Sequence, residues 1–334
     1  MKRATGVVLS VLLLLAALCL AFAVGRYPIS PSALVAVLWQ ALSGTPAGQP
    51  EAVATVVFGI RGPRVLAAML VGAALAASGA SYQALFRNPL VSPDILGVSA
   101  GAAVGAGIGI LFDLPAALIQ ALAFGFGLAA VGAAWMVAAS LRRLDPTLVL
   151  VLAGIALGSL FGAGIALIKL LADPYNQLPA LTFWLLGSLA SVRAVDVWTI
   201  LPAVLLGIVP LWFLGFRIDA LATSEDEARA LGIETGRIRA AVIAGATLAT
   251  AAVVSLAGTV GWVGRVVPHM ARLLVGPAFA LLLPASGLLG AGFLLLVDTL
   301  ARTAGRQELP LSALTAIIGT PLFILLLARA RRGW

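Results

Sequence analysis

Few residues in this chain have side chains of the kind that carry out covalent or metal chemistry. His269 is the single histidine and Cys19 the single cysteine, and Cys19 lies within an apolar run. A zinc site normally takes several histidine, cysteine or carboxylate ligands, so the sequence predicts no metal site and no enzymatic centre. His269 follows Pro268, and we expect it to have a structural role at a helix bend. There is no GxxxxGK[ST] loop, so we do not expect the chain itself to bind ATP.

Charged residues within the apolar segments are also rare. Asp298 and Arg302 are four residues apart with the acid first, which favours an intrahelical ion pair anchoring the end of a span. Arg265 fits no such pattern, and we leave open whether it faces a water-filled cavity. A proton- or sodium-coupled carrier normally keeps ionisable groups in mid-span. An ion-coupled secondary transporter is therefore only a distant alternative.

The composition indicates a membrane protein. The 334 residues are 62% hydrophobic and 10% charged, with a mean hydropathy of +1.11, whereas soluble domains carry about 25% charged residues. The net charge of +8 comes from basic residues spread singly and in pairs at the ends of apolar runs. This spacing is typical of a membrane protein rather than of a nucleic-acid-binding surface.

Apolar runs of membrane length predict about ten transmembrane helices. The runs cover residues 7–24, 64–84, 96–112, 116–141, 148–171, 197–215, 240–257, 262–275, 284–301 and 311–328. The first run is too long for the apolar part of a typical signal peptide, so we expect it to be a span. Thirteen of the 21 lysines and arginines then fall on the side that carries both termini, and seven fall on the other. This bias predicts cytoplasmic N and C termini.

The one long polar interval is Phe216 to Arg239, with nine charged residues. Ser224 and Glu227 form a capping-box pattern at a helix start, and Gly232 is suited to end that helix. Thr235 would cap a second short helix. We expect two small helices on the cytoplasmic side that dock a soluble partner, with a simple connecting loop as the alternative.

Two further features have more than one interpretation. Gly154, Gly158, Gly162 and Ala166 recur every fourth residue, which indicates either close helix packing or the lining of a passage. The Asn88-Pro89 turn lies on the predicted cytoplasmic side, where it is either part of an inner gate or a rigid connector.

Several long motifs resemble one transporter family. Residues 83–102, QALFRNPLVSPDILGVSAGA, strongly resemble the signature of the FecCD-type permeases, the membrane subunits of iron-siderophore, haem and vitamin B12 ABC importers. The likeness covers nearly the whole chain, and its other motifs are 61–64 (RGPR), 183–189 (FWLLGSL), 258–264 (GTVGWVG), 268–272 (PHMAR), 298–302 (DTLAR) and 308–310 (ELP). The chain departs from the family at Gly62 and Arg265, where leucine is frequent.

The resemblance implies an all-α, polytopic fold like that of the vitamin B12 importer permease, a type II ABC importer. Residues 1–334 would form a single transmembrane permease domain in a bacterial or archaeal cytoplasmic (inner) membrane. The implied partners are a second copy, two cytoplasmic ATPases, one extracytoplasmic substrate-binding protein and the lipid bilayer. No cofactor is implied for this chain, because ATP and Mg²⁺ would bind the partner ATPase.

The same resemblance assigns expected roles to individual residues. Residues 216–239 would be the loop of coupling helices that seats in the ATPase, with Ser224, Asp226, Glu227, Ala228, Leu231 and Gly232 as the coupling residues. Arg61, Arg64 and Arg302 match arginines offered to acidic residues of the binding protein. Candidates for the gate and pathway are Asn88, Pro89, Gly97, Ser99, Gly154, Gly158, Gly162 and Arg265.

The expected cargo is a metal chelate, namely a ferric siderophore, haem or cobalamin. Relatives with the same fold carry small oxyanions, so molybdate or tungstate is the alternative, and no residue excludes it. A passage lined by glycine, alanine, leucine and valine should bind its cargo weakly, which would leave recognition to the binding protein.

Overall fold

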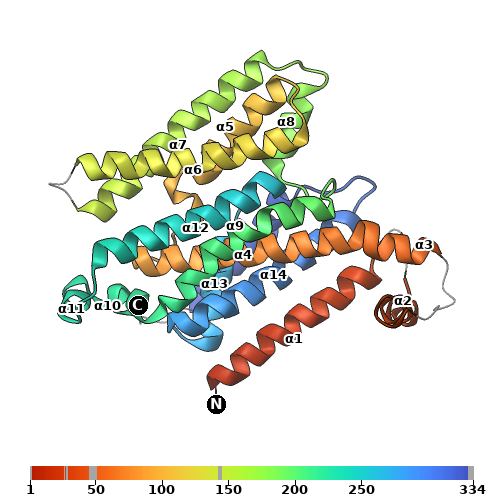
Figure 1. The fold of residues 1–334 in the computed structure, drawn as a ribbon, viewed down its shortest axis with the longest axis horizontal. Coiled ribbons are helices and arrows are strands. Elements are labelled where there is room, and N and C mark those ends of the chain that lie inside the picture. Colours follow the sequence, from red (N-terminus) through yellow and green to blue (C-terminus); the bar gives the residue numbers. More distant parts are fainter. Residues whose placement is uncertain (1, 26, 28, 45–50, 142–144, 330–334) are drawn as a thin grey trace.

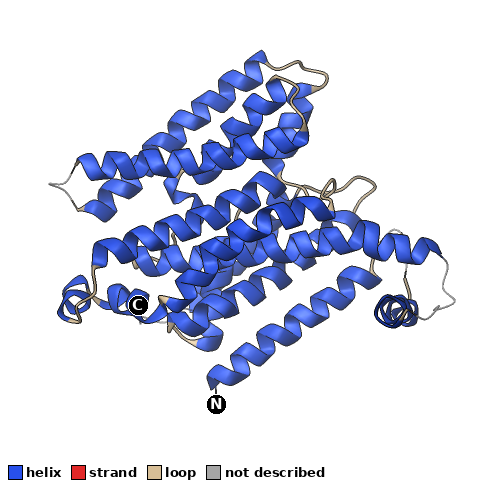
Figure 2. Ribbon diagram, viewed as in Figure 1, coloured by secondary structure: helices blue, strands red, loops and turns tan. Residues whose placement is uncertain are grey.

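The computed structural model describes all residues except 1, 26, 28, 45–50, 142–144 and 330–334, and the described residues form helices and loops without strands (Figures 1 and 2). The predicted all-α class is therefore confirmed. The helices are α1 (Lys2–Ala23), α2 (Pro31–Ser43), α3 (Glu51–Ala54), the π-helix η1 (Thr55–Arg61), α4 (Gly62–Phe86), the 3₁₀-helix η2 (Pro93–Leu96), α5 (Val98–Leu111), α6 (Ala116–Ser140), α7 (Pro146–Leu171), α8 (Gln177–Leu186), α9 (Ala194–Phe213), α10 (Gly215–Thr223), α11 (Glu225–Ala230), α12 (Thr235–Ala257), α13 (Val263–Val275), α14 (Phe279–Thr303) and α15 (Leu311–Arg329).

Each of the ten predicted apolar runs coincides with a helix, but the number of spans is not confirmed. Seven helical stretches within the described residues are long and apolar enough to cross a membrane. Helices α5 and α13 have only 14 and 13 residues, and the stretch Leu311–Leu326 of α15 is also shorter than a full span. A span of about 20 residues is needed at 1.5 Å per residue. The count of about ten therefore stays a prediction.

The central body of the molecule is formed by α4, α12 and α14. In each, more than 60% of a membrane-length window is buried, whereas α1, α6, α7 and α9 bury less than 30%. In Figure 1, α5 to α8 form a group above this body and α1 lies along its lower edge. Helices α10 and α11 lie at the left end of the view and α2 at the right end. We call these the α11 end and the α2 end.

Glycines bring the central helices into backbone contact. A Cβ added to Gly72 of α4 would lie 2.2 Å from the carbonyl oxygen of Gly290 in α14, and one added to Gly290 would lie 2.3 Å from that of Gly72. Gly207 of α9 and Gly245 of α12 form a similar pair, at 2.4 and 2.5 Å. Helices in lipid gain little from the hydrophobic effect, so close contacts of this kind supply much of their packing energy.

These contacts predict how glycine substitutions should affect stability. Gly72→Leu forces a side chain against the backbone of α14, and overpacking of this kind costs about 1–3 kcal/mol or more. Gly132→Leu in α6 is the matched control, because nothing lies within 4 Å of a Cβ there. We expect thermal unfolding in detergent to shift clearly downward for Gly72→Leu alone. Equal melting of the two variants would contradict the α4–α14 contact.

Candidate functional site

The polar interval between α9 and α12 folds into an ordered helix pair at the α11 end. Ser224 caps α11, because its hydroxyl oxygen accepts a hydrogen bond from the Glu227 N–H at 3.1 Å. At the other end Gly232 adopts a left-handed φ of 75°. The N–H groups of Gly232 and Ile233 donate to the carbonyls of Arg229 and Ala228, both at 2.9 Å. This is a Schellman motif, so the predicted start and end of the helix are confirmed.

The prediction of a second short helix capped by Thr235 is wrong. Thr235 instead opens the long helix α12, and α10 is the other short helix of the pair. The Thr235 hydroxyl donates to the carboxylate of Glu225 at 3.1 Å, and Arg229 and Arg239 pair with the same carboxylate at 3.0 and 3.4 Å. Burial alone would raise the pKa of Glu225, but these partners hold it below its ordinary value. The pattern at Thr235 is a tertiary contact that resembles a cap.

The surface of this helix pair combines an exposed leucine with exposed charges. Leu231 is 61% exposed, so most of its apolar side chain is not buried by this chain. Asp226 and Glu227 are also exposed, and Ala228 is buried beneath them. The predicted coupling residues therefore form a compact, capped surface with one apolar projection.

The helix pair is tied to the central body by two hydrogen bonds. The Asp219 carboxylate of α10 accepts from the N–H of Phe279 at 2.9 Å, which caps the start of α14. Arg87 follows the end of α4 and donates to the Leu221 carbonyl of α10 at 2.7 Å. A displacement of α10 therefore acts directly on α4 and α14.

The three predicted docking arginines line one cavity of about 230 Å³ at the α2 end, together with Glu308 and Tyr27. The sequence explains how they reach it. Pro63 has no N–H to donate, and the Gly62 N–H bonds the Val57 carbonyl five residues back, so the chain passes through the π-helix η1 before α4. A Cβ at position 62 would lie 2.9 Å from that carbonyl oxygen, so glycine avoids a close contact there.

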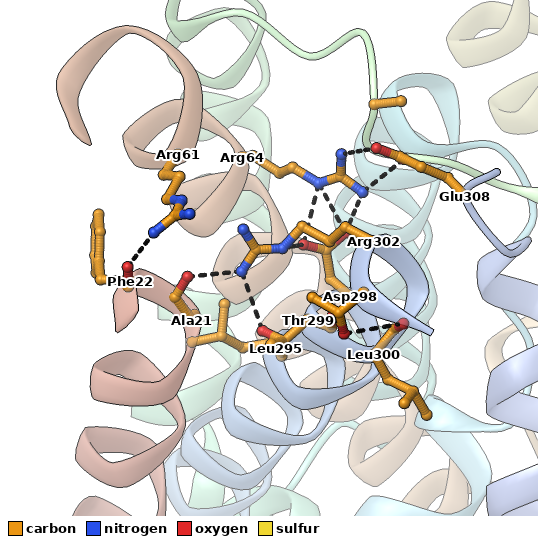
Figure 3. Close-up of polar contacts among 12 residues, drawn as sticks. Ala21, Phe22, Arg61, Arg64, Leu295, Asp298, Thr299, Leu300, Arg302 and Glu308 are labelled. Atoms are coloured by element: carbon orange, nitrogen blue, oxygen red, sulfur yellow. Dashed lines mark hydrogen bonds and ion pairs between the residues drawn. The ribbon is translucent and has the colours of Figure 1, made fainter. Parts of the chain in front are cut away.

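Arg64 is at the centre of a buried ion-pair network (Figure 3). Its Nε donates to Asp298 Oδ1 at 3.0 Å, and its Nη1 and Nη2 donate to the two carboxylate oxygens of Glu308 at 2.8 and 2.9 Å. Arg302 Nε lies 3.4 Å from Asp298 Oδ2. The predicted Asp298–Arg302 pair is therefore present, but Asp298 is fully buried rather than at a surface.

Arg61 and Arg302 also satisfy the last carbonyls of α1, which have no partner within that helix. Arg302 Nη2 donates to the Ala21 carbonyl at 2.7 Å, and Arg61 donates to the Phe22 carbonyl (Figure 3). Arg61 also donates to the carbonyl of Tyr27, which follows α1. All three arginines are less than 10% exposed. Sequence analysis predicted the Asp298–Arg302 pair but missed the partners of Arg61 and Arg64, although Glu308 and Asp298 each belong to a recognised motif.

Several of the candidate pathway residues lie beside η2. A Cβ on Gly154 of α7 would meet the Ile95 carbonyl at 2.4 Å, whereas Gly158 and Gly162 have nothing within 4 Å. The glycine stripe therefore divides into one packing position and two open ones. Gly97, with φ 84°, lies against Gly154 and Gly158 and allows α5 to begin directly after η2.

Asn88 and Pro89 form a turn beside the helix pair. The Asn88 side-chain oxygen accepts from the Leu90 N–H at 2.9 Å, which closes the turn after α4. Asn88 lines a cavity of about 430 Å³ with Glu225 of α11 and Asp145 at the start of α7.

The other polar candidates contact residues in or beside η2. The Ser99 hydroxyl donates to Asp94, and Arg265 donates to the Ser92 hydroxyl at 3.3 Å. His269 is buried within α13.

Comparisons with known proteins agree with this arrangement. The model of the FecCD transport family matches residues 13–329. The molybdate import system permease protein MolB of Haemophilus influenzae is 38% identical over 327 residues, covering 96% of this chain and 95% of MolB. The cobalamin import system permease protein BtuC of Halobacterium salinarum is 40% identical over 283 residues, covering 84% of this chain and 75% of BtuC.

A solved structure has the same fold. A structure described as "an inward-facing conformation of a putative metal-chelate type ABC transporter" superposes with a TM-score of 0.87 and 34% sequence identity, covering 97% of this chain and 98% of that one. The predicted resemblance is confirmed, and so is the likeness to metal-chelate ABC permeases. The chain belongs to the FecCD transport family of ABC permeases.

Proposed function

We propose that this chain is the membrane subunit of a binding-protein-dependent importer, in which two copies enclose the passage and a separate ATPase supplies the energy. The observation that supports this most directly is the capped helix pair α10–α11. It presents exposed Leu231 at one end of the molecule and is hydrogen-bonded to the start of α14 and to Arg87 at the end of α4, two of the three central helices. Docking of an ATPase there would bias the packing of the whole body.

A second copy would cover polar groups that the single chain leaves exposed within the membrane. Gly154, which packs against η2, lies seven residues into the apolar stretch that starts at Thr147, or about 10 Å along α7. Asp94 of η2 is exposed, and Ser99 and Arg265 beside it are only half-buried. Lipid cannot solvate such groups. A water-filled passage between two copies would solvate them, and Gly158 and Gly162 would then lie on its wall.

Coupling would run from the helix pair to this wall. Glu225 of α11 and the Asn88 turn line the same cavity, and η2 follows that turn by four residues. We therefore assign the Asn88-Pro89 turn to the inner gate. The α11 end would face the cytoplasm, with both termini on that side.

The arginine-lined cavity at the α2 end would receive the extracytoplasmic binding protein. Arg64 and Arg302 are balanced by Asp298 and Glu308, whereas the contacts of Arg61 in this cavity are backbone carbonyls. Arg61 is therefore the residue of the three whose charge is best placed to attract acidic side chains.

The cargo is a metal chelate or a molybdenum-type oxyanion. Likeness to a metal-chelate transporter of known structure favours the chelate, and 38% identity to a molybdate permease over nearly its full length favours the oxyanion. The test is to purify the cognate binding protein, titrate it with ferric siderophores, haem, cobalamin and molybdate, and measure uptake of the bound compound into proteoliposomes. Uptake that needs neither ATP nor the binding protein would refute the proposed function and support a secondary transporter.

The first functional prediction concerns Leu231. Leu231→Asp would place an unpaired charge in the ATPase groove, at a cost of a few kcal/mol, roughly the cost of burying an unpaired polar group. We expect co-purification with the ATPase and ATP-driven uptake to fall at least tenfold. Membrane insertion and thermal stability should not change, because Leu231 is exposed in the permease itself.

Leu42→Asp is the matched control. Leu42 is 85% exposed on α2, at the opposite end of the molecule from α11 (Figure 1). We expect this variant to keep its ATPase. If Leu231→Asp also retains the ATPase and full transport, the assignment of the coupling surface is wrong.

A further prediction concerns Arg61. Arg61→Gln should slow association with the binding protein several-fold at low salt and flatten its salt dependence, because charge attraction mainly speeds encounter and is screened within about 10 Å at 0.1 M salt. Arg193→Gln is the control, since Arg193 is exposed and paired with Asp196 at 3.2 Å outside this cavity. The measurement is the association rate at several salt concentrations.

Arg64 is less suitable for this test. Arg64→Glu would place a third carboxylate beside those of Asp298 and Glu308. The variant should therefore lower thermal stability as well as slow uptake. An association rate unchanged by Arg61→Gln would remove the basis for electrostatic docking at this cavity.

A further inference from the structure

Arg265 is a cation held at a fixed place on the proposed wall of the passage. It is the third residue of α13, and its side chain is half-buried. Small residues before it set its position. A Cβ on Gly79 of α4 would meet the Gly264 carbonyl at 1.9 Å, and one on Gly264 would meet Pro93 of η2 at 2.7 Å. Helix α13 therefore packs tightly against α4 and η2 directly before Arg265.

Hydrogen bonds on both sides then fix the residue. Gln83 of α4 donates from its side-chain amide to the Arg265 carbonyl at 3.1 Å, and Arg265 Nη2 donates to the Ser92 hydroxyl at 3.3 Å. The guanidinium carbon lies 5.3 Å from the centre of the Trp262 ring. Trp262 adopts an uncommon positive φ of 69°, and its ring packs edge-on against Phe323 of α15.

The charge of Arg265 is not neutralised by an ion pair. Among the described residues, no carboxylate oxygen lies within 4.0 Å of its guanidinium. Its Nε is buried and donates to no atom of the described chain. Arg64 and Arg302, by contrast, are each paired with an acid. An unpaired cation at membrane depth is unfavourable unless water or a ligand solvates it.

The neighbouring carboxylate of Asp94 attracts Arg265 through its charge but forms no ion pair with it within 4.0 Å. Asp94 of η2 accepts the hydroxyl hydrogen of Ser99 at the start of α5. It is exposed, and the next residue, Ile95, packs against Gly154 of α7, one helical turn before the open position Gly158. An anion at Arg265 would thus be attracted by the guanidinium and weakly repelled by Asp94. A transient contact of this kind suits a passage, since cargo held tightly could not leave.

We propose that Arg265 contacts the cargo during its passage and that this cargo is an oxygen-rich anion, either a tetrahedral oxyanion or the anionic groups of a metal chelate. The inference rests on the proposed function and narrows its cargo class. A guanidinium is suited to this task because its planar donors match the paired oxygens of such anions. Only one of these donors has a hydrogen-bond partner in the described chain.

The test uses the complete complex of permease, ATPase and cognate binding protein in proteoliposomes. Uptake is measured with radiolabelled molybdate, an anionic ferric tris-catecholate and uncharged cyanocobalamin. The variants are Arg265→Gln, Arg265→Lys and Asp94→Asn. The last variant removes the negative charge that lies near Arg265. We expect anion uptake to fall at least tenfold in Arg265→Gln and to stay within threefold of the original in Arg265→Lys. Asp94→Asn should retain or increase it.

Control readouts separate a cargo contact from a structural role. Thermal stability, ATPase activity and affinity for the binding protein should be the same in Arg265→Gln as in the unmodified complex. Uptake of molybdate but not the catecholate, or the reverse, would identify which anion the contact serves.

Three results would overturn the inference. The first is cyanocobalamin as the sole transported probe, and the second is anion uptake unaffected by Arg265→Gln. The third is that Arg265→Gln and Asp94→Asn lose uptake and thermal stability to the same extent, which would show that both residues serve the structure rather than the cargo. If the unmodified complex shows no ATP-dependent uptake of any probe, the proposed function itself fails and this inference fails with it.

Discussion

Backbone contact between glycines of neighbouring helices is the constraint on which the rest of this structure depends. The Gly72–Gly290 contact joins α4 to α14, Gly207–Gly245 joins α9 to α12, and Gly79 meets the backbone of Gly264 at the start of α13. Lipid tails are as apolar as the side chains they surround, so helices in a bilayer associate chiefly through such close contacts and through polar bonds. Because the backbones touch, the helices cannot slide past one another without large losses in packing.

The polar contacts at the two ends follow from this rigid centre. Helices α4 and α14 carry Arg64 and Asp298 near one end, while Arg87 and the N–H of Phe279 contact α10 at the other. A buried ion pair of this kind adds little net stability, but removing one partner costs about 3–5 kcal/mol because a charge is left unpaired. The network therefore fixes the arrangement of α1, α4 and α14 and makes their relative position sensitive to any partner that competes for the arginines.

The sequence predicted most of what depends on local patterns. Apolar length located a helix at every predicted span, and Ser224 and Gly232 marked the ends of α11 correctly, because a cap involves only neighbouring residues. The short helices α2 and α8 were missed, since their apolar runs lie outside those of membrane length. Contacts between distant residues could not be predicted. The Arg64–Glu308 pair spans 244 residues. The bond from Thr235 to Glu225 forms only in the folded chain, so the sequence pattern indicated a helix cap at Thr235 instead.

Overall similarity does not determine what such a permease carries. This chain is 38% identical to a molybdate permease and 40% identical to a cobalamin permease, and these cargoes differ greatly in size and charge. Most of the shared identity must then serve helix packing and the contacts with partners, which are common to the family. Cargo class can be encoded only by the few side chains that face the passage. The glycines that we assign to the proposed wall have no charge to contribute, so Arg265 and Asp94 are the pair there through which the chain would favour one charge over the other.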